Sequence, residues 1–428
     1  MVMVGVLFVS LAVFFLIGVP IAFSLGLASL ITLLVRVPPI PLEVIPQRII
    51  VAADSFPLMA VPFFLLAGNL MESGGISNRL IKFAGALVGH VRGGMSFVAV
   101  LASVFFGGIS GSAVADTTAI GSITIPAMLR RGYNKGFVAA VQGAAGTIGV
   151  LIPPSVPLIV YGVSVGGVSI GDLFIGGIIP GLMMAIILIL VSYIIAIKMG
   201  YEGEARPTIK ETVIAFKESI LALLMPLIII VGIRTGIFNP TESAVVAVIY
   251  SLIIGKFVYK ELSWQKIHQI LIKTAISTGV IMIIIATASL FGWLLTIEQI
   301  PQWVSIKMMS ITSSKIVFLV LLNIILLIVG TFLETNAAII MLAPLLYPIA
   351  AQYDINLVHF GLLMIVNLAV GMITPPLGVT LLISCGITNV SLSQTLKYVC
   401  IYLLAMILVL LLITFIPNIV LLLPNLLN

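Results

Sequence analysis

The sequence predicts an all-α polytopic membrane protein, built as an inverted repeat with about ten crossings, two re-entrant helical hairpins and two helices broken by proline pairs. Three observations lead to this prediction. The 428 residues are 61% hydrophobic and 8% charged, and the mean hydropathy of +1.33 lies far outside the soluble range. Long apolar runs follow one another along the chain. The sequence also matches itself at an offset of 222 residues, in register through several motifs.

The first apolar run has no cationic segment before it, because the first positive charge is Arg36. It is therefore expected to be a retained membrane segment and not a cleaved signal peptide. Three stretches, 76–90, 259–272 and 300–313, have the pattern of amphipathic helices along the interface, with Trp264 and Trp303 as anchors. The expected crossings are 2–18, 20–35, 57–72, 136–168, 171–198, 218–236, 242–258, 274–296, 357–388 and 397–424.

Two further stretches, 93–131 and 314–350, are too long for one crossing and are divided by the polar tips "GGISGSAVADTT" and "GTFLETNAA". Each half has about 16 residues, or about 24 Å of helix, which is short of the ~20 residues that a crossing requires. Each stretch is therefore predicted to be a re-entrant hairpin that returns to its own side of the membrane.

Proline pairs interrupt the apolar stretches 136–168 and 357–388, within "GVLIPPSVPLIVYG" and "GMITPPLGVTLLIS". Proline has no N–H and clashes with the preceding turn, so carbonyl groups lose their helical partners. In hydrocarbon, such groups are tolerated only where protein or a watery cavity satisfies them. A broken helix near the midplane therefore offers carbonyls to cations and a helix N-terminus to anions. The alternative is a simple kink packed against neighbouring helices.

The self-match divides the chain into a first repeat, 1–210, and a second repeat, 211–428. Each repeat contains one hairpin followed by one broken helix. A constant register across hairpin, loop and broken helix indicates inverted repeats. The offset of 222 pairs Pro126 with Pro348, Asn134 with Asn356, Gly149 with Gly371, and Pro153-Pro154 with Pro375-Pro376.

Cationic residues predict the orientation, because Lys and Arg collect on the cytoplasmic side of a membrane. With residue 1 outside, both termini lie in the periplasm and the cytoplasmic segments hold 15 of the 20 Lys and Arg residues. The first hairpin then opens toward the cytoplasm and the second toward the periplasm. The five remaining cations, of which the last two fit this orientation imperfectly, are Arg36, Arg48, Arg234, Lys307 and Lys315.

Several function classes are disfavoured by the sequence. Nucleic-acid binding is not expected, since the net charge of +6 belongs to the membrane topology. Cys385 and Cys400 lie in or beside apolar runs, so neither a disulfide nor a metal site is expected. The sequence has no HExxH motif, no Walker loop and no Cys/His cluster, which argues against an enzyme and for transport driven by an ion gradient. An intramembrane enzyme with Asp116 and Glu334 as an acid pair is the alternative from another class.

Four motifs, "GGISGSAVADTTAIGSITIPAMLRRGY", "GTIGVLIPPS", "DINLVHFG" and "GMITPPLGV", resemble the large membrane subunit of tripartite ATP-independent periplasmic (TRAP) transporters. The resemblance covers essentially the whole chain. It implies a sodium-driven, binding-protein-dependent importer of an organic acid, such as a C4-dicarboxylate or sialic acid, in the bacterial inner membrane. It also implies an elevator mechanism, in which hairpins and broken helices move as one body against a scaffold.

The same resemblance implies the partners: a small four-helix membrane subunit, a soluble periplasmic binding protein and the lipid bilayer. No small-subunit sequence is fused here, so a separate partner chain is expected. A stand-alone ion-coupled carboxylate transporter of related design, which needs no binding protein, is the alternative.

Sodium, the coupling ion that the resemblance implies, is a hard cation and takes oxygen ligands. A single Ser or Thr in a membrane helix usually bonds back to its own helix, so the prediction depends on clustering at the hairpin tips and breaks. The candidate Na⁺ ligands are Ser110, Ser112, Asp116, Gly146, Gly149 and Ile152 in the first repeat, and Thr331, Thr335, Asn336, Gly371, Ile373 and Thr374 in the second.

The candidate substrate ligands are Ser112, Ser155 and Glu334. Each serine begins a half-helix whose positive end points inward, which suits an anion. Asp116 and Glu334 are the acids that this topology buries deepest, and burying an ionisable group is costly. The repeat does not pair them, because Glu334 aligns with Ser112 and Asp116 with Ala338. Glu334 is expected to bind substrate or a cation, with helix capping as the alternative; Asp116 is expected to cap its half-helix or to bind the cation.

Overall fold

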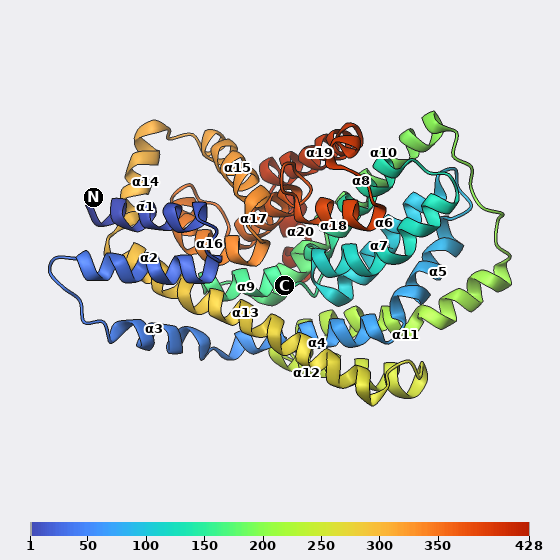
Figure 1. Cartoon of the computed structure of the whole chain (residues 1–428), viewed down its shortest axis with the longest axis horizontal. Coiled ribbons are helices and arrows are strands. Elements are labelled where there is room, and N and C mark those ends of the chain that lie inside the picture. Colours follow the sequence, from blue (N-terminus) through green and yellow to red (C-terminus); the bar gives the residue numbers. More distant parts are fainter. Residues whose placement is uncertain (1, 428) are drawn as a thin grey trace.

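The computed structural model describes residues 2–427, which form helices and short connections with no strand among them. Figure 1 shows an elongated molecule in which hairpins from both ends reach the middle. The helices are α1 (Val2–Leu16), α2 (Ile21–Val35), α3 (Val44–Ala53), η1 (Phe56–Met59), α4 (Ala60–Ser73), α5 (Ile76–Val88), α6 (Gly94–Ser110), α7 (Ala113–Arg130), α8 (Lys135–Gly146), η2 (Thr147–Val150), α9 (Val156–Val165), α10 (Ile170–Met199), α11 (Ile209–Arg234), α12 (Pro240–Ile253), η3 (Ile254–Val258), α13 (Trp264–Ile297), α14 (Ile300–Ile311), α15 (Lys315–Phe332), α16 (Thr335–Gln352), α17 (Leu357–Gly371), α18 (Val379–Thr388), α19 (Leu392–Phe415) and α20 (Asn418–Leu427).

Helical hairpins are present at both predicted positions, as α6 with α7 and as α15 with α16, and their re-entry into the membrane stays a prediction. The first turns at Gly111, whose φ of +59° is a conformation that favours glycine. The second turns through Leu333 and Glu334, which are extended. In Figure 1 the first hairpin enters from the right end of the molecule and the second from the left end.

Both predicted helix breaks are also present. The first interrupted helix runs as α8, η2 and α9, and the second as α17 and α18, with the proline pairs in the connections. Both pairs contain a cis peptide bond. The local structure follows the offset of 222: the side chains of Asn134 and Asn356 each cap the following helix by accepting two backbone N–H bonds. The division of the chain at residue 210 stays a prediction.

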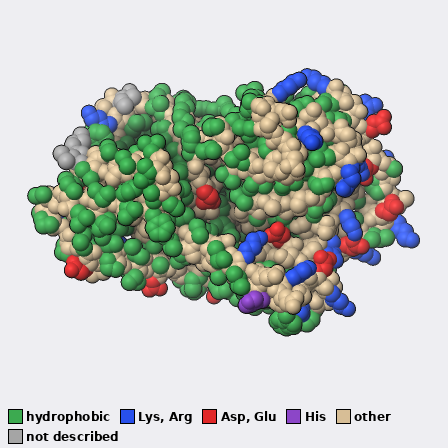
Figure 2. Space-filling model, viewed as in Figure 1, with side chains coloured by type: hydrophobic (Ala, Val, Ile, Leu, Met, Phe, Trp, Pro, Cys, Tyr) green, Lys and Arg blue, Asp and Glu red, His purple; other side chains and the backbone are tan. Residues whose placement is uncertain are grey.

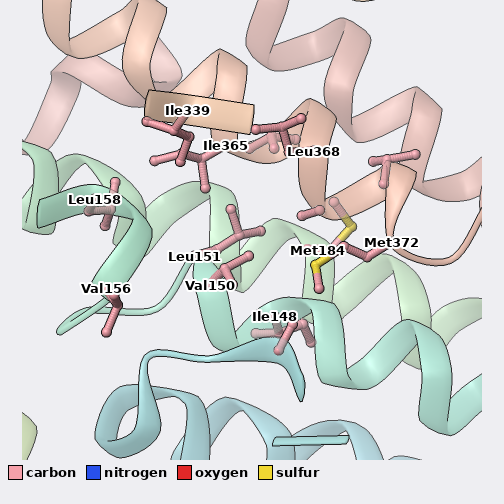
Figure 3. Packing of buried hydrophobic residues seen from close by; sticks show 14 of the residues in the cluster. Ile148, Val150, Leu151, Val156, Leu158, Met184, Ile339, Ile365, Leu368 and Met372 are labelled. Carbon is pink, nitrogen blue, oxygen red and sulfur yellow. The ribbon is translucent and has the colours of Figure 1, made fainter. Parts of the chain in front are cut away.

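The second halves of the interrupted helices pack against the opposite hairpin. Helix α9 of the first repeat packs on α16 of the second, and α18 of the second packs on α7 and α8 of the first. Figure 3 shows the shared interior, where Val150 and Leu151 point toward Ile365 and Leu368 of α17, and where Met184 of α10 and Met372 also lie. These side chains are almost completely buried. We call α6 to α9 and α15 to α18 the central body, because their packing joins both repeats in one core.

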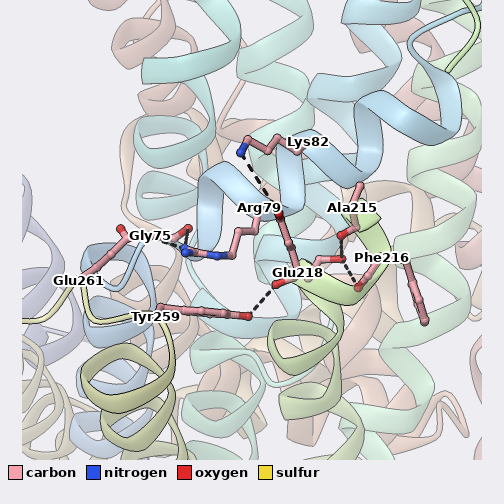
Figure 4. A network of polar contacts seen from close by, with 9 residues as sticks. Gly75, Arg79, Lys82, Ala215, Phe216, Glu218, Tyr259 and Glu261 are labelled. Atoms are coloured by element: carbon pink, nitrogen blue, oxygen red, sulfur yellow. Dashed lines mark hydrogen bonds and ion pairs between the residues drawn. The ribbon is translucent and has the colours of Figure 1, made fainter. Parts of the chain in front are cut away.

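Seven of the helices outside the central body form an outer framework, defined as α2, α3, α4, α5, α11, α12 and α13. Helix α4 packs along α12, α5 along α11, and α13 crosses α2, α3 and α4. A polar network at one end ties α5 to α11 and to the segment before α13 (Figure 4). In it, Arg79 pairs with Glu261 at 2.7 Å and lies over the ring of Tyr259, whose hydroxyl donates to the Glu218 carbonyl at 2.8 Å. These contacts hold the framework helices together.

Three expected elements were wrong in their boundaries. The interfacial helix 259–272 and the crossing 274–296 form one 34-residue helix, α13, because Ser263 caps its start and no proline interrupts it. The expected span 397–424 is divided into α19 and α20, since Pro417 follows the last turn of α19 and cannot continue its hydrogen bonding. Helix α3 lies in a segment where the sequence predicted no helix.

Eight of the described helices have the length and apolar composition of membrane crossings, and they include both α15 and α16. The prediction of about ten crossings counted a different set, because it included α1 and α2, which have only 15 residues each, and left out the hairpin arms. The chain is a multi-pass membrane protein. Figure 2 shows Lys and Arg side chains gathered at the right end, over the ends of α5, α10 and α11.

Candidate functional site

The tips of both hairpins line one cavity of about 430 Å³ near the middle of the molecule. The first hairpin contributes Gly111 to Val114 and the second contributes Glu334 to Ala337. Helix α13 of the outer framework forms the facing wall with residues between Ile276 and Ile284. In Figure 2 the surface is hollowed near its middle, where an acidic side chain lies. The cavity therefore sits between the central body and the framework.

Ser112 and Glu334, which the repeat aligns, are the N-caps of the second arms of the two hairpins. The Ser112 hydroxyl accepts from the N–H of Ala115 at 3.4 Å. One Glu334 carboxylate oxygen accepts from the N–H groups of Asn336 at 2.9 Å and Ala337 at 3.1 Å. The other accepts from the Asn336 side-chain amide at 2.8 Å. These bonds give Glu334 the capping role that was the alternative expectation for it. Its side chain is also exposed in the cavity.

Asp116 does not cap its half-helix, which corrects one of its two expected roles. Helix α7 begins at Ala113, so Ser112 holds the cap position and Asp116 follows inside the first turn. Asp116 is completely buried. The Ser103 hydroxyl is near enough to interact with it, but neither carboxylate oxygen has a hydrogen-bond partner of normal geometry. A buried carboxylate without partners is costly and indicates a site for a positive group.

The glycine at the first break allows this carboxylate to approach the backbone. A Cβ atom at Gly149 would lie 2.9 Å from one Asp116 carboxylate oxygen and 3.1 Å from the Ser112 carbonyl oxygen. Gly149 also stands four residues before Pro153, which has no N–H to donate to the Gly149 carbonyl. The Asp116 carboxylate and the Ser112 carbonyl are thus gathered around Gly149.

In both breaks, a hydroxyl side chain donates a hydrogen bond to a backbone carbonyl that has lost its helical partner. Pro154 and Pro376 cannot donate to the carbonyls of Val150 and Met372, which the offset of 222 pairs. The Ser155 hydroxyl donates to the Val150 carbonyl at 2.7 Å, and the Thr380 hydroxyl donates to the Met372 carbonyl at 2.9 Å. The breaks differ one residue earlier, where the Gly371 carbonyl accepts from the Thr374 N–H at 2.9 Å.

The remaining candidate residues are divided between the cavity and the surrounding core. Thr335 and Asn336 line the cavity together with Ser112 and Glu334. Ser155 is buried away from it, and the first N–H of α9 donates to the Gly111 carbonyl at 3.3 Å. Two hydroxyls bond back to their own helices, Thr331 to the Ile328 carbonyl and Thr374 to the Val370 carbonyl. The residues that do not line the cavity are Ser110, Asp116, Gly146, Gly149, Ile152, Ser155, Thr331, Gly371, Ile373 and Thr374.

Sequence reasoning missed the wall that α13 contributes. Ser277 faces the cavity from this helix, and Leu65 faces it from α4. The signal available was the spacing of Lys273 and Ser277, which stand four residues apart and so share one face of an otherwise apolar helix. The prediction divided this helix between 259–272 and 274–296, so Lys273 and Ser277 were not considered as one face.

We expect the variant Glu334→Ala to unfold more easily than wild type by about 1 kcal/mol, because α16 would lose its N-cap. Glu334→Gln should stay close to wild type, since the amide oxygen can still accept the two backbone N–H bonds. Thermal unfolding of both purified variants checks this expectation. Equal stability of the alanine variant and wild type would show that the cap does not stabilise the hairpin.

Comparisons with known proteins identify relatives over nearly the whole chain. Residues 8–419 match the model of the family described as "Tripartite ATP-independent periplasmic transporter, DctM component". The isethionate TRAP transporter permease protein DctMQ of Oleidesulfovibrio alaskensis is 44% identical over 97% of this chain, which spans 65% of that relative. The C4-dicarboxylate TRAP transporter large permease protein DctM of Pseudomonas aeruginosa is 40% identical over 94% of both chains. The sialic acid TRAP transporter large permease protein SiaM of Vibrio cholerae is 39% identical over 99% of both chains.

A solved structure shares the fold. The YdaH transporter of Alcanivorax borkumensis superposes with a TM-score of 0.61 over 89% of this chain and 90% of that one, at 16% identity. At this identity the likeness concerns the fold alone, and it agrees with a helical membrane protein.

Proposed function

Because the chain belongs to the DctM component family of TRAP transporters, we propose that it is the large permease of a sodium-driven importer of an organic acid, which a periplasmic binding protein delivers. Relatives in this family are transporter components and not enzymes. One observation supports the proposal most: two repeat-related hairpin tips, capped by Ser112 and Glu334, meet in a single cavity. The relatives are named for isethionate, C4-dicarboxylate and sialic acid, which are all organic anions.

The groups around Asp116 fit a sodium ion. Sodium prefers oxygen ligands, and a buried carboxylate with two unpartnered oxygens supplies both charge and ligands. The Ser112 carbonyl lies beside the same glycine as this carboxylate. We assign the first sodium site to Asp116, with Ser110, Ser112 and the Gly149 carbonyl as neighbours. When bound, the ion would neutralise the carboxylate and join α7 to the first break.

A second sodium site in the other repeat has weaker support. The equivalent glycine, Gly371, already accepts a hydrogen bond at its carbonyl, and Ala338 stands where Asp116 would. Thr335, Asn336 and the carbonyls near Ile373 are the oxygen groups that remain there. The two repeats would therefore hold sodium with different strength.

An elevator mechanism is consistent with the packing. The central body joins both hairpins and both interrupted helices through α9 with α16 and α18 with α7. The outer framework meets the cavity mainly through one helix, α13. Movement of the central body along α13 would carry the cavity across the membrane without breaking its core.

The charge distribution gives the proposed orientation in a bacterial inner membrane. The right end in Figure 2, which is rich in Lys and Arg, would face the cytoplasm. The opposite end, where Figure 1 shows α1, would then face the periplasm, and there a binding protein would dock, while α20 lies near the middle of the view. The apolar outer surface would contact lipid and the small four-helix subunit.

Reconstitution into liposomes tests the function. We expect uptake of labelled isethionate, succinate or sialic acid only when sodium, the small subunit and the cognate binding protein are all present. Replacing external sodium with potassium should abolish uptake. Uptake without the binding protein would support the stand-alone transporter instead. A chemically altered product would support an enzyme, although Asp116 does not line the cavity that contains Glu334.

A further inference from the structure

Three cavities lie in a row along one face of α13. The central one, between the hairpin tips, has about 430 Å³. A cavity of about 360 Å³ adjoins it and shares Leu65, Ser112, Val114 and Ser277 with it. A third, of about 460 Å³, lies beyond Ile284 toward the other end of the helix. Seven of the α13 residues that face them recur at spacings of three or four and therefore form one stripe: Lys273, Ser277, Ile281, Ile284, Ala288, Gly292 and Thr296.

Charge is distributed unevenly along this stripe. No Lys or Arg occurs among the residues that line the central cavity, whose one charged side chain is Glu334. Each flanking cavity contains one cation, Lys273 at one end and Arg48 at the other. An organic anion that passes along α13 therefore meets a cationic side chain on each side of the central cavity and none within it, and at the Lys273 end that side chain is the first one beyond the hairpin tips.

The two cations differ in how firmly they are held. The Arg48 guanidinium lies over the ring of Trp293, 4.9 Å from the ring centre. The Lys273 ammonium lies 3.6 Å from a Glu72 carboxylate oxygen, and 63% of the lysine side chain is exposed. A pair at this distance is longer than a charge-assisted hydrogen bond and exchanges readily with another anion.

The segment around this pair is otherwise fixed. Next to Lys273 on α13, the Thr274 hydroxyl accepts from the side-chain amide of Asn69 on α4 at 2.9 Å. Asn69 and Glu72 line the same cavity as Lys273, so α4 and α13 hold the pair at the wall of the cavity. The lysine end can therefore move while its base stays in place.

We infer that Lys273 receives the anionic group of the substrate as it leaves the central cavity, and that Glu72 is the internal competitor that returns to the lysine after release. This inference rests on the proposed transport of organic anions. Lys273 attracts the carboxylate or sulfonate. Glu72 competes for the same ammonium group and so speeds the dissociation of the substrate. The pair would thus set both the selection for anions and the rate of release at this end.

Substitutions of the two partners should have opposite effects. Lys273→Gln should raise the half-saturating substrate concentration by up to about fivefold, because an exposed charge contact is lost. Lys273→Arg should restore most of the affinity. Glu72→Gln should lower the half-saturating concentration and slow turnover, since nothing then displaces the substrate. The matched control is Lys266→Gln, on the same helix, where the ammonium donates to the Glu261 carbonyl at 3.0 Å outside the cavities.

The measurements are binding to the purified complex of both membrane subunits and the rate of uptake into liposomes, with whichever of labelled isethionate, succinate or sialic acid the wild type transports. The half-saturating sodium concentration is measured in the same preparations and should not change. If Lys273→Gln behaves like Lys266→Gln, or if Glu72→Gln weakens binding as Lys273→Gln does, the inference is overturned. If the wild-type complex transports none of the three anions, the proposed function fails, and this result is distinct from both.

Discussion

Replacing Asp116 with asparagine is expected to abolish sodium-dependent uptake while the sodium-free protein becomes more stable. Asparagine has the shape of aspartate but no charge, so the ion loses its one anionic ligand at the first break. Loss of a buried charged partner weakens binding by about a hundredfold. Without sodium, a neutral amide is less costly to bury than an unpaired carboxylate. Opposite changes in transport and stability distinguish this role from a structural one.

The stabilisation of the purified protein by sodium provides the measurement. A ligand that binds only the folded state raises its stability by about 2.7 kcal/mol at 100 times its dissociation constant. Wild type should show such a rise in thermal unfolding, and Asp116→Asn should show none at the same concentration. The control is Asp172→Asn, in the first turn of α10. A full sodium response in the Asp116 variant would remove this residue from the site.

Replacing Gly371 with alanine is expected to lower the stability of the folded protein more than Glu334→Ala does. A Cβ atom there would lie 2.5 Å from the carbonyl carbon and 2.6 Å from the Cα atom of Gly330. Both are backbone atoms of α15, so no side chain can turn aside, and α15 must separate from α17. Overpacking of this kind costs about 3 kcal/mol. The half-life of the purified variant at elevated temperature should fall sharply, because membrane proteins often unfold irreversibly.

Gly386 in α18 provides the matched control for this substitution. Apart from the nearby backbone of its own helix, no atom of the described residues lies within 4 Å of the position where its Cβ would be. Alanine at this helical position should therefore stabilise the protein by up to about 1 kcal/mol. Equal effects of the two alanine substitutions would show that the contact between Gly330 and Gly371 does not hold the second hairpin.

Much of the central body could be predicted because proline, glycine and capping residues act locally. The proline pairs placed both breaks, and the offset of 222 aligned Ser112 with Glu334 and Asn134 with Asn356, each of which caps a helix. These signals depend on the backbone chemistry of a few neighbouring residues. They do not require knowledge of distant contacts.

The roles of the two acids could not be predicted in the same way. The tip "GSAVADTT" offers both Ser112 and Asp116 as caps, and the start of α7 at Ala113 decides between them. A shift of one turn in that start would exchange their roles. The cavity wall formed by α13 depends on tertiary packing, since the apolar pattern of this helix does not show which face meets the hairpins.

The packing of α9 on α16, and of α18 on α7 and α8, has a consequence for the insertion of the protein into the membrane. Helix α9 ends at Val165, but the surface that it covers on α16 is synthesised only after residue 335. During membrane insertion, α9 of the N-terminal half therefore has no α16 to pack against until the C-terminal half has been synthesised. Contacts so distant in sequence form slowly, and the waiting half exposes polar backbone to lipid. We therefore expect the first half to need shelter from the insertion machinery until the second half is complete.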